Sequence, residues 1–247
     1  MKLTIEKAME LLEEVRPEIN DVRWINHSIC VGNTAARIAK ALGLDSNYAA
    51  SLGYVHDIGK CVNKEDYEWH DVSGYYYLLE KGIDEEDAMI CLTHSYINGD
   101  YTCVAGGLVD KHELRCEKLQ NHDYTYYEKI INLCDLMCTT ELMSMEKRLI
   151  DLLIRKGNHS NTKHHLLGAQ KLKDEFDILL GHDLYLLFPE ITGVKEAFLL
   201  YNYDECGIHL SIDDELSISY KKALDRKEEL KKEYNDDWDI KPMKINY

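Results

Sequence analysis

Helical spacing of apolar residues is the feature that most constrains the fold of this chain. The spacing continues through successive segments as far as Gly181, and only three prolines occur in 247 residues to interrupt it. In the segment 22–42, for example, Val31, Thr34 and Ile38 recur at steps of three and four residues, the period of one helix face. We therefore predict an all-α helical bundle over residues 1–189.

The sequence changes character after Pro189. Residues 197–203 and 208–212 are apolar or aromatic and predict short strands or buried turns, whereas residues 213–235 are charged and predict a helix. We treat residues 190–247 as a C-terminal appendage. Its type stays open, and it is expected to be mixed, with a final charged helix.

The balance of charge limits the partners of this chain. It carries 29 basic and 45 acidic side chains, a formal net charge of −16, which disfavours a broad surface for nucleic acid or for anionic membranes. No apolar stretch has membrane-spanning length, and the first residues lack a secretory-signal pattern. Cysteines lie mostly in apolar runs, as reduced thiols do, and Cys134 and Cys138 fit one turn of a packed helix. We expect a cytoplasmic protein, and the oligomeric state stays open, with a homodimer among the alternatives.

Histidine and aspartate residues at helix ends and on inward helix faces form the candidate site. The doublet His56-Asp57 follows a helical segment and precedes Gly59, and such a doublet alone would most often be an ordinary hydrogen-bonded pair. Asp135 shares one helical stripe with apolar residues up to Leu142, and a buried carboxylate without a partner would be costly. In chain order, the candidate ligands are His27, His56, Asp57, His70, His94 and Asp135.

Metal ligation accounts for this set better than six separate roles do. Alone, His27 would be a hydrogen-bonded core histidine, and His70 or His94 would be a helix cap. A metal site needs several ligands together, and imidazoles with carboxylates suit divalent cations, of which iron or manganese is expected here. Lys60 could contact a substrate phosphate or satisfy carbonyls at its helix end, and Arg23 could contact a phosphate or fix a carboxylate.

The order of these residues resembles that of the HD superfamily of metal-dependent phosphohydrolases. The signature of that superfamily is a histidine, a His-Asp doublet and a distal aspartate on a bundle of helices. His27, His56-Asp57 and Asp135 match it in order, and the resemblance covers roughly residues 20–180, the size of one domain. The resemblance implies an HD-domain helical bundle followed by the appendage.

Two further histidines extend the resemblance. Six-ligand members of the superfamily place two histidines between the doublet and the last aspartate and hold two metal ions, and His70 and His94 occupy those places. The sequence at 70–84 and at 128–135 looks like that of bacterial symmetrical diadenosine tetraphosphate hydrolases. The resemblance implies one metal ion held by His27, His56 and Asp135, a second held by His70 and His94, and Asp57 as the bridge between them.

The function that the resemblance implies is hydrolysis of a small phosphorylated substrate, a nucleotide or dinucleoside polyphosphate, by a water that two metal ions activate. Asp57 and Lys60 are the expected catalytic residues, and Lys60 and Arg23 the expected substrate contacts. Two alternatives stay open: a diiron oxygenase of the same superfamily, and a non-catalytic sensor that binds a nucleotide. A cyclic-dinucleotide phosphodiesterase fits less well, because the Gly-Tyr-Pro signature of that subfamily is missing near His94.

Two other features stand apart from the candidate site. Residues 96–123 combine glycines with mixed polarity and predict a long irregular insertion, a lid or binding loop. A looser group of histidines is expected at surface or capping positions, and it comprises His159, His164, His165 and His182.

Overall fold

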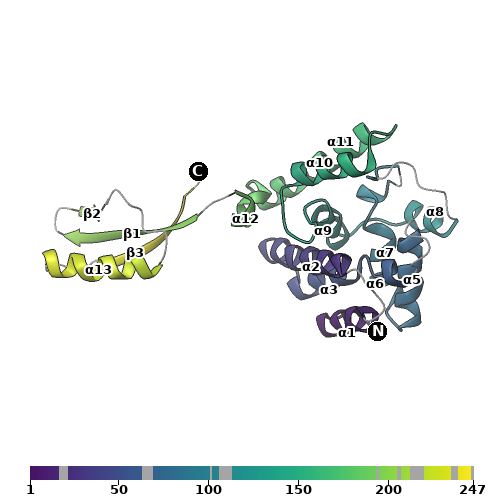
Figure 1. Ribbon diagram of the computed structural model, residues 1–247, viewed down its shortest axis with the longest axis horizontal. Coiled ribbons are helices and arrows are strands. Elements are labelled where there is room, and N and C mark those ends of the chain that lie inside the picture. The colour runs from purple at the N-terminus through teal and green to yellow at the C-terminus, as the bar shows by residue number, and fades with distance from the viewer. Residues whose placement is uncertain are drawn as a thin grey trace. The chain divides into compact units, whose positions relative to one another are not determined.

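The protein divides into two compact units, Met1–Leu187 and Phe188–Tyr247 (Figure 1). The computed structural model describes residues 1–16, 22–62, 69–100, 102–105, 113–192, 195–204, 207–211, 220–234 and 239–245. The first unit is a bundle of helices, so the all-α prediction is confirmed for it. The second unit contains a small sheet of three strands among its described residues.

Figure 1 labels many of the helices of the first unit. In chain order, the helices that the structure describes in this unit are α1 (Ile5–Val15), α2 (Arg23–Ala41), α3 (Ser46–Val55), α4 (Gly59–Val62), α5 (His70–Glu80), α6 (Glu85–Ala88), α7 (Ile90–Thr93), η3 (Ile97–Gly99), α8 (Glu113–Gln120), α9 (Tyr126–Asp135), α10 (Met145–Lys156), α11 (Thr162–Leu180) and η4 (Leu184–Leu187). Among the helices that the structure describes, none combines the length and the apolar composition needed to cross a bilayer.

Helices α2 and α3 pack closely because two glycines face each other at their crossing. A Cβ atom added to Gly53 of α3 would lie 2.5 Å from the Cα atom of Gly32 in α2, a distance that folded proteins do not tolerate. Fully buried Ile38 of α2, Val55 of α3 and Ile131 of α9 belong to the apolar core of the unit. The close crossing therefore sets α2 and the C-terminal end of α3 beside the same core.

A second glycine contact positions the residues after α3. A Cβ atom added to Gly59, the first residue of α4, would lie 1.8 Å from the carbonyl oxygen of His70 and 2.5 Å from the backbone nitrogen of Gly74. Only a residue without a side chain lets the backbone of α4 pass the first turn of α5 at this distance. The doublet His56-Asp57 is thereby held next to the beginning of α5.

Helix α9 ends earlier than its apolar stripe predicts. A capping box begins it, because Thr125 Oγ1 accepts from the Glu128 N–H while the Glu128 carboxylate accepts from the Thr125 N–H. The helix stops at Asp135, and Cys138 and Leu142 pair in an isolated antiparallel bridge. The predicted helical stripe through Leu142 and the predicted helical turn from Cys134 to Cys138 were therefore wrong. After Asp135 the chain turns back on itself, and one of the backbone hydrogen bonds in this turn runs from the nitrogen of residue 139 to the oxygen of residue 141 at 2.9 Å.

The prediction that residues 96–123 are irregular was wrong for their second half. Residues Glu113–Gln120 form α8, and Ile97–Gly99 form the short helix η3, while residues 101 and 106–112 lie outside the described part. The pattern of α8 is weak because only two of its side chains are buried, Leu119 and the charged Arg115. A charged residue at an inward position hides a helix from a search for apolar periodicity.

In its described residues, the second unit combines an antiparallel sheet with two helices. Strand β1 (Lys195–Asp204) lies between β2 (Gly207–Ser211) and β3 (Asp239–Ile245), and the helices are α12 (Pro189–Thr192) and α13 (Tyr220–Tyr234). In the register, Tyr201 lies opposite Leu210 on β2, and Phe198 lies opposite Pro242 on β3. The sequence allowed either strands or buried turns at residues 197–203 and 208–212. Residues 197–203 lie in β1 and residues 208–211 in β2, while residue 212 lies outside the described part. Strand β3 was not predicted from the sequence.

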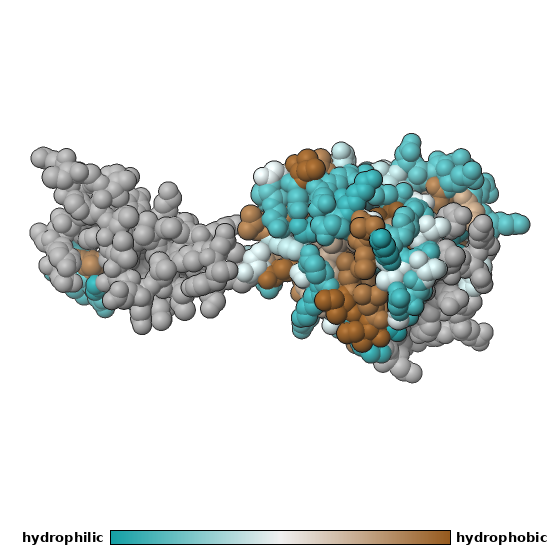
Figure 2. Space-filling view, turned by 90° about the horizontal axis from the view of Figure 1, so that it is seen from above, coloured by the Kyte–Doolittle hydropathy of each residue, from teal (hydrophilic) through white to brown (hydrophobic). Residues whose placement is uncertain are grey.

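The surface of the first unit carries both polar and apolar side chains. Figure 2 shows hydrophilic residues over much of this face of the molecule, with apolar areas between them. Exposed large apolar side chains of the unit include Ile150 and Ile154 of α10 and Leu167 and Ile178 of α11. Association of two copies stays a prediction.

Candidate metal centre

His27, His56 and Asp135 come from three helices and meet in one cluster. His27 lies on the buried face of α2, His56 is the C-cap of α3, and Asp135 is the last residue of α9. The Nε2 atom of His27 lies 2.9 Å from Oδ1 of Asp135 and 3.3 Å from Nε2 of His56. One ligand atom from each residue lies within 4.8 Å of the other two, so one metal ion could contact all three.

Asp57, His70 and His94 form a second cluster. Asp57 directly follows His56, His70 is the first residue of α5, and His94 is the C-cap of α7. The Nε2 atoms of the two histidines lie 3.2 Å apart, and each lies 3.3 Å from Oδ1 of Asp57. This group meets the same 4.8 Å criterion for a shared ion.

The two oxygens of Asp57 face different clusters. While Oδ1 faces His70 and His94, Oδ2 lies 3.6 Å from Nε2 of His27 and 3.6 Å from Nε2 of His56. The carboxylate is 1% exposed, and its Oδ1 makes no hydrogen bond. A buried oxygen that lacks a donor and faces two imidazole nitrogens fits a cation between them, so the residues present suit a metal ion at each cluster.

Backbone carbonyls orient three of the imidazole rings. Nδ1 of His27 lies 3.0 Å from the oxygen of Thr139, Nδ1 of His56 lies 2.7 Å from that of Gly53, and Nδ1 of His94 lies 2.8 Å from the oxygen of residue 91. Each Nδ1 is therefore the protonated nitrogen that donates to a carbonyl. The Nε2 atoms are left to carry the lone pair that a metal ion binds.

The charges around the centre favour the ligand forms of two residues. Burial lowers the pKa of His56 to about 3, so its ring is neutral near pH 7. Burial alone would raise the pKa of Asp57, but the Lys60 ammonium and the rings of His56, His70 and His94 together outweigh burial and hold that pKa well below the usual range. Burial also acts to lower the pKa of His27, yet the Asp135 carboxylate outweighs it and raises the pKa, so a proton competes with a metal ion at this ring.

The two predicted substrate contacts lie in different surroundings. Lys60 belongs to α4, donates a hydrogen bond from Nζ to Oδ2 of Asp57, and keeps 29% of its side chain exposed. Arg23 is the first residue of α2 and is exposed at the surface. The structure thus brings Lys60 to the six candidate ligands, and the role of Arg23 stays a prediction.

Asn132 and Ser95 support the second cluster and were not found in the sequence. The Asn132 amide donates to the carbonyl oxygen of Thr93 at 2.9 Å and to that of His94 at 2.7 Å, and Ser95 Oγ lies 2.8 Å from Nε2 of His94. Asn132 lies one turn before Asp135 on an inward face of α9. An amide at such a position needs buried partners, and this is the signal that could have identified it.

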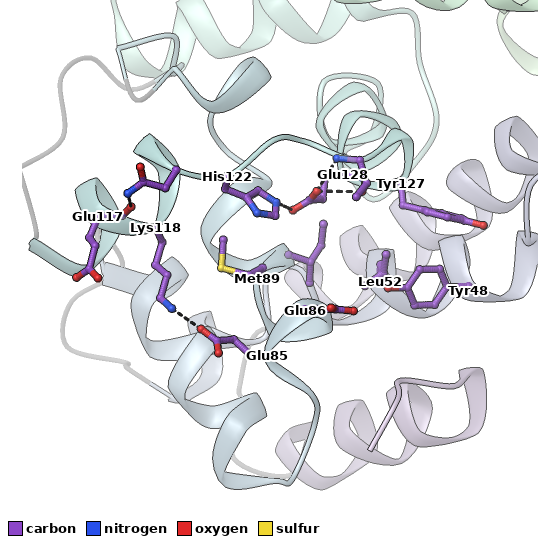
Figure 3. A pocket seen from close by; sticks show the side chains of 13 residues that line it. Tyr48, Leu52, Glu85, Glu86, Met89, Glu117, Lys118, His122, Tyr127 and Glu128 are labelled. Carbon is purple, nitrogen blue, oxygen red and sulfur yellow. Dashed lines mark hydrogen bonds and ion pairs between the residues drawn. The ribbon is translucent and has the colours of Figure 1, made fainter.

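A pocket of about 770 Å³ lies at the other ends of the same helices (Figure 3). Its lining includes Tyr48 and Leu52 from the first half of α3 and Glu128 from the first turn of α9, whereas the metal ligands stand at the C-terminal ends of these helices. His122 Nε2 lies 2.6 Å from Glu128 Oε1 within it, and Lys118 pairs with Glu85. None of the six candidate ligands lines this pocket.

Among the other histidines whose side chains the structure describes, none joins either cluster. His164 pairs with Asp100 at 2.8 Å, His159 Nε2 lies 3.1 Å from the carbonyl oxygen of Ala105, and His182 is exposed. His165 is 5% exposed, so the expectation of a surface or capping position was wrong for this residue. It lies on the inward face of α11, where burial lowers its pKa to about 4.

Comparison with known proteins identifies one domain. Residues 24–139 match the family model of the HD domain, and this range contains all six candidate ligands. No curated protein sequence matches the chain.

Two solved structures are similar to the chain at low identity. One is the HD domain of the L. monocytogenes phosphodiesterase PgpH, with 17% identity, 69% of this chain and 95% of that chain covered, and a TM-score of 0.40. The other is the same domain in complex with cyclic-di-AMP. Its identity is 18%, the match covers 72% of this chain and 97% of that chain, and the TM-score is 0.42. Both likenesses are distant, and neither assigns a substrate to this chain.

Proposed function

We propose, from the premise that residues 24–139 are an HD domain, that this protein is a metal-dependent hydrolase of phosphoric esters or anhydrides. One observation carries the proposal. The carboxylate of Asp57 lies between two clusters and offers Oδ2 to one and Oδ1 to the other. A carboxylate in this position would be shared by two cations, which is the ligand arrangement used in two-metal hydrolysis.

Each ion would have its own set of ligands. His27, His56 and Asp135 would hold one, His70 and His94 the other, and Asp57 both. Four imidazoles among six ligands suit iron or manganese better than magnesium. When bound, the pair of ions supplies an activated water and neutralises phosphoryl oxygens.

Lys60 has a role that changes with metal binding. Its ammonium bonds to Asp57 Oδ2, the oxygen that would face the first metal ion. A cation held by that oxygen would leave the lysine free to turn toward the exposed side of the site, where 29% of its side chain already lies. A released ammonium would bind a substrate phosphate as a point charge.

The proposed substrate is a nucleotide or a dinucleoside polyphosphate. Two supports favour this class: the HD domain itself, and the likeness of residues 70–84 and 128–135 to diadenosine tetraphosphate hydrolases. The acidic net charge of −16 does not oppose it, because the ions and Lys60 supply local positive charge.

A substrate panel tests the proposal. Anaerobically purified protein, loaded with Mn²⁺ or Fe²⁺, is assayed for release of phosphate or nucleotide from mononucleotides, diadenosine tetraphosphate and cyclic dinucleotides, with Asp57→Asn as the matched inactive control. We expect hydrolysis that the control lacks. Metal-loaded protein that binds a nucleotide without turnover, or that consumes dioxygen without releasing phosphate, would contradict the assignment in favour of the sensor or the oxygenase.

A further inference from the structure

Asp71 is a buried carboxylate that directly follows His70, and it is fully hydrogen-bonded. Nε of Arg115 donates to Oδ2 at 2.7 Å, and Nη2 of Arg115 donates to Oδ1 at 2.8 Å. The Tyr96 hydroxyl donates to Oδ2 at 3.0 Å, and the Val72 N–H donates to Oδ1 at 2.8 Å. Each oxygen accepts two bonds, so the carboxylate has one orientation.

Arg115 is buried to the same degree as its partner. It is 2% exposed, and its guanidinium carbon lies 5.4 Å from the centre of the Trp69 ring and 5.7 Å from that of Tyr96. A guanidinium at this depth is stable only with a carboxylate and aromatic faces around it. Arg115 and Leu119 are the buried side chains of α8, so this arginine is a main attachment of α8 to the bundle.

This arrangement is adjacent to both histidines of the second cluster. Asp71 comes one residue after His70, and Tyr96 comes two residues after His94. The hydrogen bond from Tyr96 to Asp71 therefore joins the first turn of α5 to the chain that leaves α7, the two elements whose histidines lie 3.2 Å apart. The first cluster takes its described support from other groups, the carbonyl oxygens of residues 139 and 53.

We propose that Arg115 is a positioning residue for the second metal ion, acting through Asp71 and Tyr96 on the separation of His70 and His94. The inference rests on the metal centre proposed above. It gives the segment 96–123 a defined part in the site: α8 supplies the arginine that holds the second pair of imidazoles in place. The first metal position is independent of this contact.

Manganese binding to the full-length protein tests the inference without a substrate. Metal-free protein is titrated with Mn²⁺ in a calorimeter, and electron paramagnetic resonance distinguishes a lone ion from a coupled pair. The variants are Arg115→Lys, which keeps the charge but loses the bidentate fork, and Tyr96→Phe, which removes one hydrogen bond. The control is Lys173→Met, which breaks another ion pair, from a buried lysine to the partly buried Asp177, both in α11, a helix that holds none of the six candidate ligands.

The expected result separates the two sites. Wild type and Lys173→Met bind two ions and give a coupled signal. Arg115→Lys binds the first ion as wild type does, and its second ion about 10- to 100-fold more weakly, the usual effect of losing an outer support of a ligand. Tyr96→Phe shows the same selective effect to a smaller extent.

Three outcomes would overturn the inference. Folded Arg115→Lys could bind both ions with the affinities of the wild type, it could bind both ions equally more weakly, or the wild-type protein could bind fewer than two ions. The proposed hydrolysis fails separately. A selective loss of the second ion in a protein that cleaves no phosphorylated compound would leave the role of Arg115 intact and refute the activity alone.

Discussion

Replacing Gly59 by alanine should damage the metal centre without touching any ligand. The added Cβ would lie 1.8 Å from the carbonyl oxygen of His70, whereas ordinary contacts begin at 3.4 Å, so α4 and α5 must move apart by about 1.6 Å. The three obstructing atoms, the carbonyl oxygen and carbon of His70 and the nitrogen of Gly74, belong to the backbone and cannot rotate away. Overpacking of this kind costs about 1–3 kcal/mol, and we expect the upper end of that range.

The same displacement acts on the site, because Asp57 lies two residues before Gly59 and its Oδ1 is 3.3 Å from Nε2 of His70. A misplacement of about 1 Å can cost on the order of 100-fold in rate, so kcat/KM should fall by about that factor or more. Denaturant unfolding measures the stability, and metal analysis with the phosphatase assay measures the site.

Gly157→Ala is the matched control for this substitution. Gly157 ends α10 with φ 77° and ψ −177° and has nothing within 4 Å of an added Cβ, so the change costs only backbone strain, about 1–3 kcal/mol. The control should keep its metal and its activity. A Gly59→Ala protein that is as stable as Gly157→Ala and holds two metal ions would refute the argument that this glycine sets the distance between the doublet and α5.

Three further predictions concern separate parts of the molecule. Lys60→Met should leave the metal content unchanged. It should raise KM and so lower kcat/KM by about 10- to 100-fold, because it removes a charge-assisted contact to the substrate phosphate. An unchanged KM in steady-state kinetics would exclude that contact. Tyr48→Phe removes the hydrogen bond at 2.6 Å from the Tyr48 hydroxyl to Oδ1 of Asp87, and it should lower the free energy of unfolding by about 1–2 kcal/mol. The activity should stay complete; a loss of activity would show that α3 transmits the change to His56. Chelation should lower the melting temperature, and Mn²⁺ at about 100 times its Kd should restore about 2.7 kcal/mol at each position; a melting temperature that does not respond to metal would mean that no ion binds the folded state.

Helical periodicity predicted most helices of the first unit, and residue chemistry selected its candidate ligands. Apolar steps of three and four residues mark α2, α10 and α11, and the six candidate ligands stand on inward faces or at helix ends, where the structure brings them into two clusters. The pattern works because burial of one helix face is a local property that sequence spacing records.

Features that depend on partners distant in sequence could not be read in this way. The end of α9 at Asp135 depends on the turn that follows it, and the helix α8 depends on Arg115, whose partner Asp71 lies 44 residues earlier in the chain. Carbonyl oxygens that orient the imidazoles, such as those of Gly53 and Thr139, carry no side-chain signal at all. A strand such as β3 is specified by its pairing with β1, and short strands have weak patterns of their own.

The most direct test of the account is metal analysis of anaerobically purified protein beside its Asp57→Ala variant. Wild type should contain two divalent ions per chain and release phosphate or nucleotide from a phosphorylated substrate, and the variant should lose both, since its missing carboxylate faces all four imidazole nitrogens at 3.3–3.6 Å. Asp57→Ala protein that is folded and holds two ions per chain would contradict the assignment of Asp57 as the bridge.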